Sequence, residues 1–88
     1  MQINTIHTRN PLARWDIDIT VTAENKEKIA HVRVDVNDFT EDDEDVSPPA
    51  NKWHKILQQQ GQFPGENKVV VTATDDNGQD SSDVEEWE

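Results

Sequence analysis

Oxygen-bearing side chains gather near the end of the chain, around an Asn-Gly dipeptide. Asp75, Asn77 and Asp80 lie close enough in sequence to converge on one turn. Calcium takes about six to eight oxygen ligands from carboxylates and carbonyls, so these side chains are candidate calcium ligands. The segment that starts at Asp75 does not match an EF-hand loop. Glu86 falls at the twelfth position, as such a loop requires, but Asp80 stands at the sixth, where glycine is required. Calcium is therefore a hypothesis, and its alternative is an ordinary turn held by Asp and Asn side chains.

A run of carboxylates is the densest charge in the chain. Its members are Glu41, Asp42, Asp43, Glu44 and Asp45. Carboxylates about 6 Å apart repel by roughly 0.7 kcal/mol per pair even in bulk water, which opposes compact packing. With Pro48 and Pro49 close behind, the run predicts a solvated acidic loop over residues 39–51. Functional residues concentrate on loops held by a rigid scaffold, so these five acids are candidate partner-binding residues.

Serine and histidine side chains give no sign of a catalytic centre. A nucleophilic triad would have to be drawn from Ser47, Ser81 and Ser82 with His7, His31 and His54. No serine stands in a Gly-x-Ser-x-Gly turn, and the histidines lack the i, i+4 spacing of a helical zinc site. The chain has no cysteine, which removes thiol nucleophiles and thiolate zinc ligands. We therefore expect no enzymatic activity and assign no catalytic residue.

The net charge of the chain limits the kinds of partner it can bind, and its length limits the number of domains. The 19 Asp and Glu residues outnumber the 8 Lys and Arg residues, for a formal net charge of −11. This balance disfavours nucleic acid and anionic lipid, whose phosphates must be neutralised by Lys and Arg. It favours cations and basic protein surfaces, or solubility alone. No stretch approaches the roughly 20 apolar residues of a membrane span. We expect one domain, given the length of 88 residues, and a monomer without membrane insertion.

The first half of the chain predicts β-strands. Apolar and polar residues alternate over 15–23, and a period of two is typical of a half-buried strand. The alternation repeats over 29–36 after a short polar connection, which favours an antiparallel hairpin. Ile3 and Ile6 predict a first edge strand within residues 1–12.

The second half continues the β pattern. Residues 52–60 fit either a helical stripe or a strand, and we favour the strand. A turn is expected at 62–65, which contains proline and glycine. Residues 68–74 are rich in β-branched side chains, and an Asn-Gly turn leads to a returning strand over 79–87. The expected core includes Trp15, Trp53 and Val71. About six strands without a confident helix predict an all-β sandwich.

The segment 67–78 resembles the last hairpin of bacterial immunoglobulin-like domains. Those domains carry a recurring Val-x-Val-x-Ala-x-Asp-x-x-Gly run, matched here by Val69, Val71, Ala73, Asp75 and Gly78. Residues 19–23 and 32–37 also look like the second and third strands of such domains. The resemblance implies an immunoglobulin-like antiparallel β-sandwich of about seven strands over residues 1–88. It also implies an extracellular or cell-surface setting within a longer exported protein.

Two functions fit these observations. The first is a non-catalytic immunoglobulin-like module that binds a protein or cell-surface component, or spaces other domains. The second is a free-standing cytoplasmic inhibitor that mimics nucleic acid and occupies a basic protein. Such a mimic needs its carboxylates spread over one rigid face, which a solvated loop over 39–51 does not provide.

Overall fold

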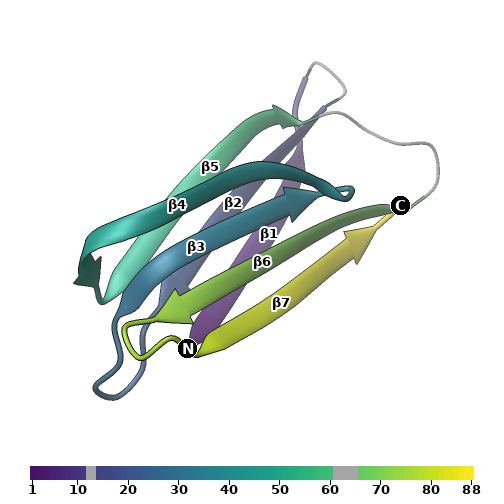
Figure 1. Ribbon diagram of the computed structural model, residues 1–88. Helices are drawn as coiled ribbons and strands as arrows, with labels where there is room; N and C mark the ends of the chain where they lie inside the picture. Colours follow the sequence, from purple (N-terminus) through teal and green to yellow (C-terminus); the bar gives the residue numbers. More distant parts are fainter. Residues whose placement is uncertain (12–13, 61–65) are drawn as a thin grey trace.

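The computed structural model describes residues 1–11, 14–60 and 66–88, which form two antiparallel sheets packed face to face (Figure 1). The strands are β1 (Gln2–Arg9), β2 (Trp15–Thr22), β3 (Ile29–Val36), β4 (Phe39–Ala50), β5 (Lys52–Gln60), β6 (Asn67–Asp75) and β7 (Asp80–Trp87). The expected all-β sandwich is confirmed, with seven strands among the described residues. The turn predicted at 62–65 lies outside the described residues.

Each lateral edge of the sandwich is formed by one edge strand from each sheet. One sheet has the order β1-β2-β5, and the other has the order β4-β3-β6-β7. In Figure 1, β4 and β5 run along one side of the sandwich, and β1 and β7 run along the opposite side. We call the β4/β5 side the charged edge and the β1/β7 side the aromatic edge, for the side chains described below.

Alternation builds the core. In β2 and β6, every second residue is buried and faces the opposite sheet, as a strand with one covered face requires. The predicted core residues Trp15, Trp53 and Val71 are 9%, 8% and 0% exposed. Full burial of a Val, Leu or Ile side chain stabilises by about 1.5–3 kcal/mol, so this thin core depends on each of its members. The predicted strands at 52–60 and within 1–12 are both confirmed, as β5 and β1.

The hairpin predicted between 15–23 and 29–36 is wrong. β2 pairs with β1 and β5, whereas β3 pairs with β4 and β6 in the other sheet. Alternation identifies the buried face of a strand, but the inner faces of both sheets alternate alike, so it does not identify the pairing partner. The connection instead reaches the β6–β7 turn, where the Asp76 N–H donates to the Lys28 carbonyl at 2.9 Å.

The acidic loop predicted over 39–51 is also wrong. Those residues form β4, which pairs with β3 through a two-residue turn at Asn37 and Asp38. Both turn residues have positive φ, 49° and 69°, as a type I′ hairpin requires. The pairing alternates the acids between the two faces, with Asp42 opposite Val34 and Glu44 opposite Val32. Carboxylates that are adjacent in sequence therefore point apart, and their repulsion does not prevent a strand.

Candidate functional site

The acidic run is divided by the pleat of β4. Asp42 and Glu44 turn toward the inside of the sandwich and are half-buried, whereas Asp43 and Asp45 turn outward and are exposed. Glu41 is exposed and lies at a register shift. Asp42 pairs with Val34 and Thr40 pairs with Asp35, so Glu41 falls between these two pairs. The five predicted partner-binding residues thus lie in three different environments.

The inward pair closes the charged edge. The Lys55 ammonium on β5 lies 2.9 Å from Asp42 Oδ1 and 3.1 Å from Glu44 Oε2. The Trp53 indole N–H donates to Glu44 Oε1 at 2.7 Å. This indole, more than the Lys55 ammonium, lowers the pKa of the Glu44 carboxyl below its usual value. The pKa of Lys55 is raised, first by Asp42 and then by Glu44. Asp42 and Glu44 therefore join the two sheets and are engaged within the molecule.

The outward pair is bridged by a histidine from the neighbouring strand. His31 Nδ1 lies 2.7 Å from Asp45 Oδ1, and its Nε2 lies 2.5 Å from Asp43 Oδ1. The pKa of His31 is raised, with the contact to Asp45 as the largest cause and the contact to Asp43 acting in the same direction. Desolvation opposes the shift. The ring joins β3 to the edge strand from the solvent side.

Carboxylates are spread over the outer surface of the four-stranded sheet. We call this surface the acidic face and define it by Asp35, Asp43, Asp45, Asp80 and Glu86. Arg33 and Lys68 are the permanent cations that β3 and β6 add to it. A shallow groove crosses the face between Asp43 and Asp80, with Thr72 and Thr74 at its base. The outer surface of the three-stranded sheet has fewer acids. They are Asp16 and Asp18 on β2, and β5 adds the cation Lys52.

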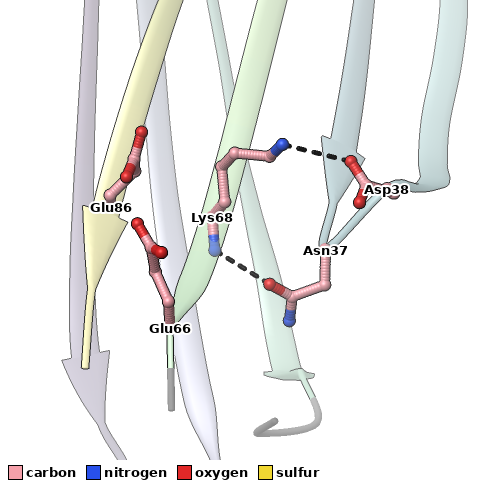
Figure 2. A pocket seen from close by; sticks show the side chains of 5 residues that line it. All are labelled: Asn37, Asp38, Glu66, Lys68 and Glu86. Carbon is pink, nitrogen blue, oxygen red and sulfur yellow. Dashed lines mark hydrogen bonds and ion pairs between the residues drawn. The ribbon is translucent and has the colours of Figure 1, made fainter.

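A second depression lies where the acidic face meets the Asn37–Asp38 turn (Figure 2). The Lys68 ammonium lies 3.2 Å from Asp38 Oδ1, and the Lys68 backbone N–H donates to Asn37 Oδ1 at 2.8 Å. The carboxyl groups of Glu66 and Glu86 stand side by side, and hydrogen bonding with Glu86 raises the pKa of Glu66. This corner extends the acidic surface to the start of β6 and the end of β7.

The three candidate calcium ligands serve the β6–β7 hairpin. Asp75 is buried, and its Oδ1 accepts the backbone N–H groups of Asn77 at 2.8 Å and Gln79 at 2.9 Å. The Thr74 hydroxyl donates to Asp80 Oδ1 at 2.7 Å. Across residues 1–11, 14–60 and 66–88, no three His, Asp or Glu side chains are placed to hold a metal ion together. Calcium binding stays a prediction, next to an Asp-stabilised turn that accounts for the same residues.

The three histidines each meet a carboxylate. Besides His31, the His54 Nε2 lies 2.7 Å from Asp18 Oδ1, and the His7 Nδ1 lies 3.1 Å from Glu85 Oε1. The Ser82 hydroxyl lies 3.2 Å from that of Thr72. The histidine and lysine contacts were not identified from the sequence, although the strand at 52–60 already placed Lys55 on the same face as two apolar residues. A lysine on a core-facing position signals an acidic partner across the interior.

Comparisons of the chain with protein-family models, with curated proteins and with solved structures found no match. Functional inference therefore rests on the geometry above. Among the described residues, no helix has the length and apolar character needed to cross a membrane.

Proposed function

We propose that the chain is a non-catalytic interaction module whose acidic face binds a basic protein surface. The observation that carries this proposal is that β4 turns the acidic run into part of a sheet, so that Asp43 and Asp45 join the acids of β3 and β7 on one rigid surface. Charge complementarity of this kind accelerates encounter and selects the partner. Along one strand, residues that share a face are about 7 Å apart, which spreads the charge over an extended contact area.

Two settings are consistent with this activity. The resemblance of 67–78 to bacterial immunoglobulin-like domains, together with the two antiparallel sheets, supports a module of a longer exported protein that acts at the cell surface. The strand order differs from the constant-type immunoglobulin arrangement, in which the fourth strand extends the first sheet, because here β4 pairs with β3.

The second setting is a free-standing cytoplasmic inhibitor that mimics nucleic acid. A rigid acidic face meets the structural requirement that a solvated loop would not meet, so this alternative gains support from β4. Both settings use the same surface, and they differ in the partner.

A pair of double variants tests the acidic face. Asp43→Asn with Asp45→Asn removes two charges and the carboxylate partners of His31. Asp16→Asn with Asp18→Asn removes the same charge and the carboxylate partner of His54 from the other sheet. Partners would be captured from the source cell at low and physiological salt, and their association rates measured. We expect the first variant to lose at least about tenfold in association rate at low salt, and the second to behave like wild type.

Equal losses in the two variants would show that only net charge matters and would overturn the acidic face as the binding surface. Loss in neither variant would overturn a role for these carboxylates. Asp43 and Asp45 are exposed, and Asp16 and Asp18 are half-buried on the outer surface of their sheet; because an amide keeps the size of each side chain, both variants are expected to keep the wild-type fold.

A further inference from the structure

The bridge made by His31 depends on how many protons its ring carries. Both ring nitrogens lie within hydrogen-bond distance of a carboxylate, Asp45 at 2.7 Å and Asp43 at 2.5 Å. An ionised carboxylate only accepts hydrogen bonds, and a neutral imidazole has a single N–H to donate. The two contacts are therefore both hydrogen bonds only in the imidazolium form. In the neutral form, one ring nitrogen presents a lone pair to a carboxylate.

The neighbouring groups do not replace this cation. On the same strand, Arg33 Nε lies 3.2 Å from Asp35 Oδ1, and its guanidinium also donates to Thr40. From β6, Thr74 faces the groove and donates to Asp80 of β7. Within the described part of the chain, the recorded ion pairs of Asp43 and Asp45 are those with His31.

We propose that His31 gates the acidic face: as an imidazolium it occupies Asp43 and Asp45, and as a neutral ring it leaves them to a cationic partner. The inference rests on the proposed function for the existence of a partner, whereas the gate itself belongs to this chain. Deprotonation also removes one positive charge from the centre of the surface. Both changes act in the same direction, so binding of a basic ligand strengthens as the pH rises.

The direction of the His31 shift sets the pH range. Because its pKa is raised above the ordinary 6.5, the bridge is fully formed below 6.5 and is lost as the pH rises through the folded-state value. Carboxyl groups as a class ionise at about pH 4, well below this range. A binding change above pH 6 therefore does not arise from the acids, and comparison with histidine variants assigns it to His31.

The test uses a peptide of eight arginines, whose guanidinium groups stay protonated throughout. Its affinity is measured at pH 6 and pH 9.5, at low salt, for wild type, His31→Gln and His54→Gln. We expect the wild-type affinity to rise by at least about threefold, as the loss of one adjacent charge implies. His54→Gln, whose partner Asp18 lies on the other sheet, should show the same rise. His31→Gln should lose most of this rise in affinity.

If the affinity of His31→Gln rises with pH as much as that of wild type, the gate is overturned. The amino terminus and the other histidines would then explain the pH response. If the peptide binds no form of the protein at any pH, the proposed function fails, and a second measurement still decides the gate. Nuclear magnetic resonance should show the His31 ring titrating with a midpoint above 6.5, and the carboxyl carbon signals of Asp43 and Asp45 changing in step with that ring. If the Asp43 and Asp45 carboxyl signals do not change as the His31 ring titrates, that result alone would overturn the gate.

Discussion

The two lateral edges of the sandwich are closed by different physical means. At the charged edge, Lys55 and the Trp53 indole bridge to Asp42 and Glu44 of the opposite sheet over distances of 2.7 to 3.1 Å. These contacts are directional, and the Lys55 side chain is 38% exposed, so water and salt weaken them. The edge therefore derives its stability from groups that carry charge.

The aromatic edge is closed mainly by stacked rings. His7 lies parallel to Trp87 with ring centroids 4.2 Å apart, and Trp15 meets Trp87 edge to face at 5.4 Å. The His7–Glu85 contact adds a polar link between β1 and β7. The indole N–H groups of Trp15 and Trp87 are buried and have no hydrogen-bond partner among the described residues. Apolar area therefore stabilises this edge, and the polar groups of its tryptophans do not.

The largest expected effect comes from removing Trp15. Trp15→Ala should lower the free energy of unfolding by about 3–5 kcal/mol, since it deletes a buried aromatic side chain from a small core. Substituting phenylalanine for each tryptophan compares the two edges directly. Trp15→Phe loses no recorded hydrogen bond, whereas Trp53→Phe removes the donor to Glu44, so the second variant should be the less stable in urea unfolding. Equal stability of the two phenylalanine variants would contradict the distinction between the edges.

An intermediate effect is expected from Lys55→Met. It leaves two half-buried carboxylates without their cation and should lower the free energy of unfolding by about 1–2 kcal/mol. That estimate lies below the roughly 3–5 kcal/mol of a fully buried pair, because Lys55 is partly exposed. Lys52→Met, on the exposed face of the same strand, is the matched control and should change little. In 1 M salt the difference between the two variants should shrink; a constant difference would mean that packing, not charge, holds this edge.

The smallest effect is an acid transition at the charged edge. Glu44 has a lowered pKa, so its contribution is complete above its ordinary value of 4.5 and is lost as the pH falls through the folded-state value. The indole N–H resonance of Trp53 should move with a midpoint below 4.5, while that of Trp15 does not follow. Glu44→Gln should abolish the Trp53 transition. A Trp53 midpoint at or above 4.5 would contradict the assigned hydrogen bond.

Much of the fold follows from alternation and turn chemistry. The β6–β7 hairpin was predicted from β-branched residues and the Asn-Gly turn, and the strands pair from Asn67 with Trp87 to Thr74 with Asp80. Alternation also identified the buried faces of β2 and β6, whereas β4 was predicted as a loop and so had no predicted buried face. The pairing of β2 was not predicted, because two sheets that share one core impose the same pattern on every strand.

The acidic run was misinterpreted for a physical reason. Repulsion was counted between neighbours in sequence, but a strand sends those neighbours to opposite faces. There Asp42 and Glu44 meet Lys55, and Asp43 and Asp45 meet His31. Lys55 is 11 to 13 residues away from its carboxylate partners, and His31 is 12 to 14 residues from its own. The His31 contacts depend on the register of β3 with β4, and the Lys55 contacts depend on how the two sheets pack, neither of which a local pattern reveals.

The position of the acidic run on a boundary strand also bears on self-association. An unpaired strand edge is a template for other copies of a chain, and fibril formation begins at such edges. Two β4 strands that met edge to edge would bring their carboxylates to within about 5 Å, where like charges repel. The register shift at Glu41 and the prolines at 48 and 49 shorten the straight stretch that a second copy could extend. We therefore expect the acids that crowd β4 to oppose polymerisation of this small, thinly cored protein through its own sheet.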